Sequence, residues 1–248
     1  VKPDTQFGVT LKNIDLEVYQ SEIFGIGGVA GNGQEELMQI LTGEKIDQSV
    51  SLNYMDNDIQ MLNPRERREM GLAFAPEERL GHAAVANLNL LENSLITDPK
   101  KRFLKKMGFI NFVELNLYTN EIIEKFNVKT TGVSALASSL SGGNLQKFVV
   151  GREIGQKPSL FIVNQPTWGV DALSAANIRQ AIVEIANNGA AIILISQDLD
   201  EILEISNKVA FLTNGNLSIP TNTMDIKTDE IGAITVSYTH LTLPTKWI

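Results

Sequence analysis

Apolar and polar positions follow two different periods along the chain, and the changes of period mark the predicted elements. Residues 9–18 alternate loosely, which is typical of a half-buried strand or hairpin. Continuous apolar runs predict buried strands at 23–26, 71–75, 160–163 and 191–196. Helical periodicity predicts helices at 35–41, 65–70, much of 88–131, 143–155, 173–187 and 199–205. Buried strands that alternate with helices predict an α/β fold with a parallel sheet covered on both faces.

Composition limits the classes of function. The chain has 248 residues and a 43% hydrophobic content, which suits one α/β domain or two small ones. Its formal charge is 21 − 29 = −8, which disfavours a nucleic-acid binder. It has no cysteine, and its two histidines, His82 and His240, make a histidine-rich metal site an unattractive hypothesis. No apolar run approaches the ~18 residues of a membrane span, and we expect a piece of a longer chain because no initiator Met is present.

A glycine-rich loop follows the first buried strand and precedes a predicted helix. The loop reads GIGGVAGNG. Gly28 and Gly33 have the spacing of the two glycines in a phosphate-binding loop, and Gly31 lies between them. Strand, glycine loop and helix form the setting of a phosphate-binding loop, whose amides and helix N-terminus hold phosphate. The full motif also needs a lysine for the phosphate oxygens and a hydroxyl for magnesium. Because Gln34 and Glu35 stand at those positions, the loop alone is a weak indication of nucleotide binding.

A second glycine motif is far more specific. Residues 140–147 read LSGGNLQK, which resembles the signature motif of ABC-transporter ATPases. Three further segments resemble family motifs in the same order: PEER with Glu77 at the Q-loop position, NQPTWGVD with Asp171 as the D-loop acid, and SQD at the switch-histidine position. The resemblance implies a P-loop NTPase fold of ABC type, with an antiparallel β-subdomain and a helical signature subdomain at about residues 88–146.

The motifs are closer still to one subfamily. GVAGNGQEEL, APEER, LSGGN-x-QK and NQPT-x-GVD resemble the C-terminal nucleotide-binding half of the double-length ATPases of sugar and nucleoside importers. The resemblance implies a nucleotide-binding domain at 1–235, with the opening VKP as a linker from an N-terminal ATPase half of the same polypeptide. It also implies membrane permease subunits as partners and, indirectly, an extracytoplasmic solute-binding protein. The chain would then be peripheral at the cytoplasmic face of the cell membrane.

In the family, two such domains hold ATP head to tail, so each residue is assigned to one of two composite sites. The cis site, formed by Gly28, Gly31, Gly33, Gln34 and Glu35, lacks the lysine charge. Asn164 stands at the position of the Walker B aspartate, Gln165 at that of the catalytic glutamate and Gln197 at that of the switch histidine. Magnesium prefers carboxylates, and an amide is no base for water. We therefore expect no hydrolysis at this site, and leave open whether it binds ATP.

The trans residues are intact. Ser141, Gly142 and Gly143 stand at a predicted helix N-terminus, where a hydroxyl, backbone amides and the helix dipole suit a γ-phosphate. By resemblance they would complete an ATP site whose loop lysine and Mg²⁺ belong to the N-terminal half. We therefore expect one competent and one degenerate site per fused pair.

Three other interpretations remain. The first is a non-catalytic pseudo-ATPase scaffold that binds no nucleotide, against which the intact LSGG argues. The second is a soluble ABC ATPase of translation or DNA repair, which should keep the lysine and the catalytic glutamate. The third is an active ATPase that uses Glu35 and Glu77 as replacement ligands, and this chain alone should then hydrolyse ATP.

The last 13 residues, VSYTHLTLPTKWI at 236–248, do not continue the α/β pattern. They resemble a translated sequencing adapter, so we expect a non-native tail that takes no part in the fold. The alternative is an ordinary C-terminal strand.

Overall fold

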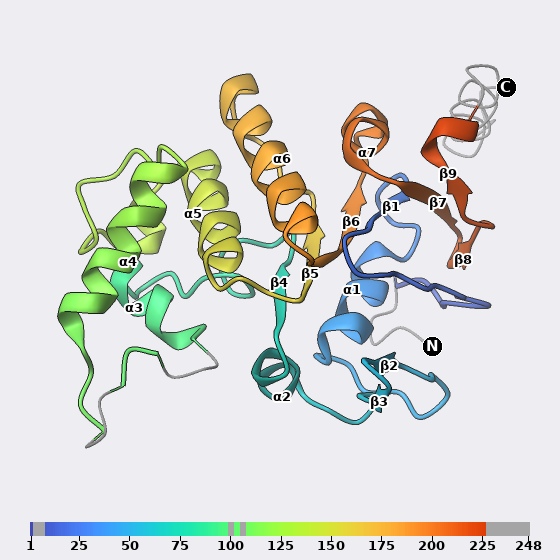
Figure 1. Ribbon diagram of the computed structural model, residues 1–248, viewed down its shortest axis with the longest axis horizontal. Helices are drawn as coiled ribbons and strands as arrows, with labels where there is room; N and C mark the ends of the chain where they lie inside the picture. The colour runs from blue at the N-terminus through green and yellow to red at the C-terminus, as the bar shows by residue number, and fades with distance from the viewer. Residues whose placement is uncertain (2–7, 99–101, 105–107, 227–248) are drawn as a thin grey trace, which may run out of the picture.

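The computed structural model describes residues 1, 8–98, 102–104 and 108–226. These residues build a mixed sheet with helices on both faces (Figure 1). The expected adapter-derived tail at 236–248 lies outside the described residues. No helix among the described residues is long and apolar enough to cross a bilayer.

Four parallel strand pairings form the centre of the sheet. The strands are β1 (Ile23–Gly27), β4 (Leu72–Ala75), β5 (Leu160–Asn164), β6 (Ala191–Ser196) and β7 (Lys208–Thr213). Their order is β4-β5-β6-β1-β7, with every neighbouring pair parallel. Two short strands, β8 (Asn216–Leu217) and β9 (Thr221–Asn222), pair antiparallel with β7. The parallel sheet expected from the apolar runs is confirmed.

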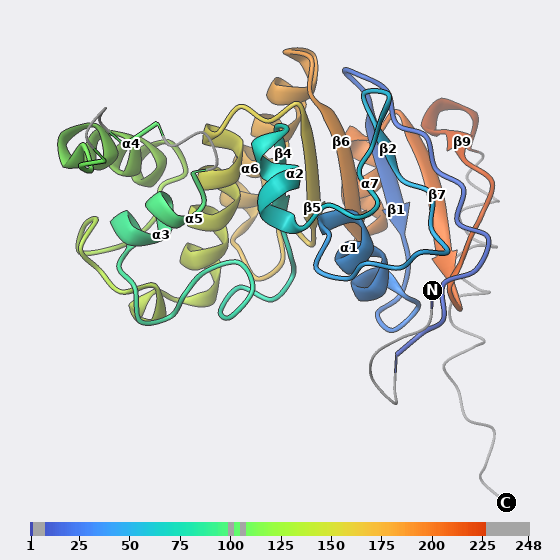
Figure 2. The same ribbon diagram turned by 90° about the horizontal axis from the view of Figure 1, so that it is seen from below.

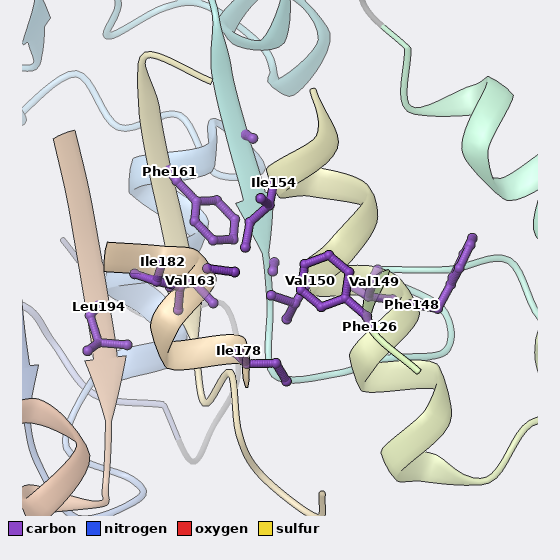
Figure 3. Packing of buried hydrophobic residues seen from close by; sticks show 14 of the residues in the cluster. Phe126, Phe148, Val149, Val150, Ile154, Phe161, Val163, Ile178, Ile182 and Leu194 are labelled. Carbon is purple, nitrogen blue, oxygen red and sulfur yellow. The ribbon is translucent and has the colours of Figure 1, made fainter. Parts of the chain in front are cut away.

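Alternate residues of each strand point to two separate hydrophobic clusters. In β5, Phe161 and Val163 belong to one cluster and Ile162 to the other. The first cluster packs against α5 (Gly142–Gly155), α6 (Ala172–Asn187) and α7 (Leu199–Ile205), as Figure 3 shows for α5 and α6. The second packs against α1 (Gln34–Thr42). Burial on both faces explains why these strands are continuously apolar.

Two helices that precede the signature motif lie at one end of the molecule, away from β7–β9 at the other end (Figures 1 and 2). They are α3 (Leu90–Ile96) and α4 (Phe112–Lys125), and a short 3-10 helix (Ala137–Ser139) leads into α5. Asn89 caps α3 in a capping box with Glu92, which is why that helix begins there. The expected helical region at 88–146 is thus present as separate helices.

The antiparallel elements are smaller than the sequence pattern predicts. The hairpin of β2 (Asn53–Tyr54) and β3 (Asn57–Asp58) follows α1, and α2 (Pro64–Glu69) follows the hairpin. The strand expected at 9–18 is not regular: its described pairing is an isolated bridge from Lys12 to Asn216. Asn13 has a φ of 50°, a left-handed conformation that interrupts extended backbone.

Candidate functional site: a degenerate glycine-loop cavity and an exposed signature loop

The cis residues meet at the carboxyl edge of the parallel strands. Gly27 ends β1 opposite Ser196 of β6, and Asn164 ends β5 opposite Ile195. A cavity of about 310 Å³ opens at this edge. Its lining residues are Gly8, Val9, Ala30, Gly31, Gly33, Gln34, Glu35, Glu36, Glu77, Asn164, Gln165 and Gln197. The structure therefore brings together residues from five separate segments of the sequence, although Gly28 of the predicted cis set is not among the lining residues.

The glycine loop has the backbone of a tight cradle. Gly31 and Gly33 have φ values of 82° and 111°, where a side chain would be strained. A Cβ on Gly28 would lie 2.5 Å from Gln34 Nε2 and 2.8 Å from Leu212 O. The loop thus wraps closely around the Gln34 side chain and opens directly into α1, whose first-turn amides have no intrahelical partners.

Gln34 uses its amide inside the loop. Its Nε2 donates to Val29 O at 2.8 Å, and its Oε1 accepts from Asn32 N at 3.1 Å. The side chain is 8% exposed. Asn32 in turn accepts through Oδ1 from Asn214 N at 2.8 Å, which fastens the loop to the β7–β8 turn. Gln34 therefore closes the loop on itself and presents no positive charge to a ligand.

The charges around the cavity are negative. Glu35, Glu36 and Glu77 line it, and none of its described lining residues is lysine or arginine. Glu36, which the sequence did not single out, accepts from Val9 N through Oε1 at 2.7 Å. Like charges repel across a short distance, so a triphosphate would need a cation that these residues do not supply.

The end of β5 offers amides where magnesium prefers carboxylates. Asn164 is 4% exposed, and its Oδ1 has no hydrogen-bond partner among the described residues. Gln165 is also buried and has a φ of 53°, and its N–H donates to Ile195 O. No group of three or more His, Cys, Asp or Glu in the described part of the chain is arranged to hold a metal ion. These donors do not fit Mg²⁺, because neutral amides replace the anionic ligands it favours. Gln197 is exposed at the cavity edge, one residue beyond β6.

The signature residues begin α5. Ser141 is its N-cap, and Asn144 donates to Ser141 Oγ from its backbone at 3.5 Å and from Nδ2 at 2.9 Å. Ser141 and Gly142 are exposed and Gly143 is half-buried. Gly142 lines a second cavity, of about 660 Å³, which Glu35, Glu77 and Asn164 also line. Ser141 and Gly143 line neither cavity.

Asp171 acts as the N-cap of α6. Its carboxylate accepts from Ser174 N at 3.0 Å and from Ser174 Oγ at 2.7 Å. These hydrogen bonds hold the pKa of Asp171 below its usual value. The carboxylate is therefore charged and fixed at the start of the helix, beside the turn of Gly169 and Val170.

Two residues that the sequence did not single out join these segments. Arg79 donates from Nε to Gln146 Oε1 at 2.9 Å, and Gln146 donates from Nε2 to Gln165 O and Pro166 O at 3.1 and 3.2 Å. Gln146 is 1% exposed. The available signal was their place inside the motifs APEER and LSGGN-x-QK.

Known proteins are similar to this chain in sequence and in fold. The sequence profile of the family described as "ABC transporter" matches residues 11–168. A glucose import ATP-binding protein of Haloferax volcanii is 33% identical over 224 residues, which cover 90% of this chain and 41% of that protein. A nucleoside import ATP-binding protein of Lactococcus lactis subsp. cremoris is 35% identical over 215 residues, 86% of this chain and 42% of that protein. This chain thus spans less than half the length of these curated relatives.

Solved structures extend the comparison to the fold. An ATP-binding subunit of an ABC transporter superposes with a TM-score of 0.75 at 19% identity, and the match covers 92% of each chain. A dimeric ATP-binding cassette in a post-hydrolysis state, bound to ADP and Pi, gives a TM-score of 0.75 at 18% identity over 86% of this chain and 90% of the other. The fold is that of ATP-binding cassettes, as the sequence motifs predict.

Proposed function

Since the chain belongs to the ABC transporter family as an ATP-binding protein, we propose that it is the C-terminal ATP-binding half of an importer ATPase for sugars or nucleosides. In this proposal the chain supplies Ser141, Gly142 and Gly143 in trans to an ATP site whose glycine loop and Mg²⁺ belong to an N-terminal half. Its own cis site is degenerate. The names of the relatives support the import role, and the match to less than half of their length supports the fused arrangement.

One observation carries the proposal: the glycine loop is closed by its own side chain, whereas the signature motif is exposed. Gln34 closes the cis loop on itself within a cavity lined by carboxylates. Ser141, by contrast, is exposed at the N-terminus of a 14-residue helix. A helix N-terminus with an exposed hydroxyl suits an anion presented from outside the chain. The domain is therefore suited to complete a partner's site and not to run its own.

The remaining parts of the proposal follow from the same family role. The nucleotide-binding domain would comprise residues 1–235, and 236–248 would be non-native. Membrane permease subunits would bind this domain directly, and an extracytoplasmic solute-binding protein would act through them. The domain would lie at the cytoplasmic face of the membrane. Closure on ATP at the trans site would then drive the permease, and the transported solute would not touch this chain.

The decisive experiment measures ATP hydrolysis by the full-length polypeptide reconstituted with its permease. Ser141→Ala should lower turnover sharply, because it removes a hydroxyl of the trans clamp. Gln34→Ala should leave turnover unchanged, because the cis site contributes no hydrolysis. Ser138→Ala, an exposed serine three residues before the signature serine, is the matched control. Unchanged turnover in Ser141→Ala would contradict the proposal.

Three further measurements, on the two halves produced separately, on this chain purified alone and on the reconstituted polypeptide, separate the alternatives. A pseudo-ATPase scaffold, which the closed cis loop favours, would associate with its N-terminal half equally well with and without ATP. Our proposal requires ATP-dependent association. A chain that is itself an active ATPase would hydrolyse ATP when purified alone, whereas we expect turnover indistinguishable from buffer. A soluble ABC ATPase would show no stimulation by a permease.

A further inference from the structure

Arg79 connects segments that lie far apart in the sequence. Its Nε donates to Gln146 Oε1 in α5, 67 residues away, and its Nη2 donates to Trp168 O at 2.5 Å, 89 residues away. Gln146 continues the connection to the backbone oxygens of Gln165 and Pro166. One guanidinium and one buried amide therefore bond the signature helix to the turn that follows β5. An arginine is suited to this task because its fork presents donors in several fixed directions.

The signature glycines pack against the same assembly. A Cβ on Gly142 would lie 2.6 Å from Arg79 Nη1, and a Cβ on Gly143 would lie 2.6 Å from Gly169 O. Gly169 has a φ of 69°, and a Cβ there would lie 3.3 Å from Arg79 Nη2. Gly143 is thus needed for close packing against the backbone of this chain, and a side chain at Gly142 would displace the Arg79 guanidinium. The signature loop and the turn at Gly169 therefore pack together around Arg79. We call the connection made by Arg79 and Gln146 the Arg79 bridge.

The carboxylates that surround Arg79 also favour its position between the two segments. It lines the 660 Å³ cavity with Glu35, Glu44 and Glu77, and it is the only lysine or arginine among the described residues of that lining. Its guanidinium stays protonated, so it balances part of this negative charge. Glu77 lies two residues away in the Q-loop segment, and the bridge therefore also ties that segment to α5.

We propose that Arg79, acting through Gln146, is a positioning residue that fixes the signature Ser141 relative to the turn before Asp171. The proposal rests on the proposed function, since it assumes that both segments face the partner's ATP site. A clamp made from two segments works only when their spacing is fixed, and a displacement of about 1 Å can cost up to about 100-fold in rate. In this role Arg79 acts through its hydrogen bonds from Nε to Gln146 and from Nη2 to Trp168, and not by contact with substrate.

Kinetics of the full-length polypeptide with its permease test the proposal. Arg79→Ala should lower kcat about ten- to 100-fold with little change in the KM for ATP, because alignment is lost and ground-state binding is not. Arg79→Lys should restore only part of the rate, since one ammonium cannot reproduce the fork between two acceptors. Gln146→Ala should resemble Arg79→Ala, and the double variant should be no worse than the worse single variant, because both belong to one unit. Arg65→Ala, an exposed arginine paired with Glu69, is the control and should keep the wild-type rate.

A distance measurement separates positioning from folding. Leu136 and Leu173 are 46% and 69% exposed and lie on the two sides that the bridge connects. This chain has no cysteine, so spin labels at Leu136→Cys and Leu173→Cys report on that spacing. Arg79→Ala should broaden the distance distribution, whereas Ser141→Ala should leave it unchanged.

The two assays distinguish failure of the bridge from failure of the proposed function. Wild-type kcat or an unchanged distance distribution in Arg79→Ala overturns the assignment of Arg79. Unchanged turnover in Ser141→Ala overturns instead the proposed trans role, whatever Arg79 does. Full rescue by Arg79→Lys would also count against the bridge, because it would show that the charge alone is sufficient.

Discussion

Asn144 holds the hydroxyl of Ser141 as a hydrogen-bond acceptor, with Asn144 Nδ2 2.9 Å from Ser141 Oγ. The orientation of the amide is fixed because its Oδ1 accepts from Lys129 N at 2.8 Å. Since Ser141 Oγ accepts a hydrogen bond from Asn144 Nδ2, the O–H of Ser141 is left to point elsewhere. An exposed O–H at a helix N-terminus is a donor for an anion from a partner.

The first prediction reverses that hydrogen bond. Asn144→Asp puts an acceptor where Nδ2 was, so the Ser141 proton should turn to the new carboxylate and no longer serve a phosphate. Loss of one donor of this kind lowers turnover about 100-fold or more. ATP hydrolysis by the full-length polypeptide measures the effect. Asn116→Asp in α4, whose Oδ1 accepts from Asn120 Nδ2 at 2.7 Å, is the control. Wild-type turnover in Asn144→Asp would contradict this role of Asn144.

The second prediction concerns the closed cis loop. Gln34→Lys places a cation among Glu35, Glu36 and Glu77, where a phosphate could use it. One opposite charge at about 4 Å is worth about 4 kcal/mol at an effective dielectric of 20, so affinity for ATP should rise at least tenfold. Hydrolysis should stay absent because Asn164 is unchanged. Isothermal titration of the purified domain measures the affinity.

Gln39→Lys is the matched control for this gain of affinity. It adds the same charge to the same helix, but Gln39 does not line the small cavity. Equal gains in the two variants would show a general effect of net charge. No gain in Gln34→Lys would mean that the carboxylates exclude phosphate from the loop altogether.

The sequence predicted the buried parts of the fold well. Continuous apolar runs located β1, β5 and β6 because strands covered on both faces leave no polar position to obscure them. The prediction of a strand or hairpin at 9–18 was wrong, because alternating apolar residues indicate which side chains are buried but not the conformation of the backbone. Asn13 adopts a left-handed conformation that no period of apolar residues reveals.

The sequence predicted which residues form the candidate site, but not the hydrogen bonds that connect them. The motifs located Gln34, Asn164 and Gln165, which the structure places around one cavity, and their functional roles stay predictions. The inward hydrogen bonds of Gln34 and the reach of Arg79 to Trp168 depend on contacts that only the folded chain creates. Spacing within a motif says nothing about such distant partners.

The third prediction tests the buried ion pairs that Glu153 of α5 forms with Arg68 and Arg152. Glu153 bonds Arg68 Nη1 at 2.6 Å and Arg152 Nη2 at 2.7 Å, and its side chain is fully buried. Burial alone would raise the pKa of Glu153, but the two arginines outweigh it and the net pKa is lowered. Glu153→Gln leaves Arg152 buried without its partner, so it should cost about 3–5 kcal/mol of unfolding free energy near neutral pH.

Urea unfolding across a pH series measures this loss. A lowered pKa means that the stabilisation is complete above the unfolded-state pKa, about 4.3 for Glu, and is lost as pH falls through the folded-state pKa. The gap between wild type and variant should therefore shrink in acid. Glu69→Gln, which removes an exposed partner of Arg65, should change stability by less than about 1 kcal/mol. A gap that does not depend on pH would contradict the charge of Glu153.

The fourth prediction concerns a carboxyl next to the switch position. Glu201 is 2% exposed; its Oε2 accepts from Ser196 Oγ at 2.7 Å, and its Oε1 is buried without a partner among the described residues. Burial raises the pKa of Glu201. A raised pKa means that the folded state holds the proton more tightly, so stability falls as pH rises from the unfolded-state value of about 4.3 through the folded-state value.

Glu201→Gln keeps the acceptor for Ser196 and removes the charge, so it should stabilise the domain by on the order of 1 kcal/mol at mildly alkaline pH. The gain should vanish as pH falls below the unfolded-state pKa, because wild-type Glu201 is then neutral in both states. Thermal unfolding at a series of pH values measures it. Glu204→Gln is the control, since this carboxylate is 58% exposed and pairs with Arg179. Parallel stability profiles for wild type and Glu201→Gln would mean that Glu201 titrates as it does in the unfolded chain, and that burial does not control its charge.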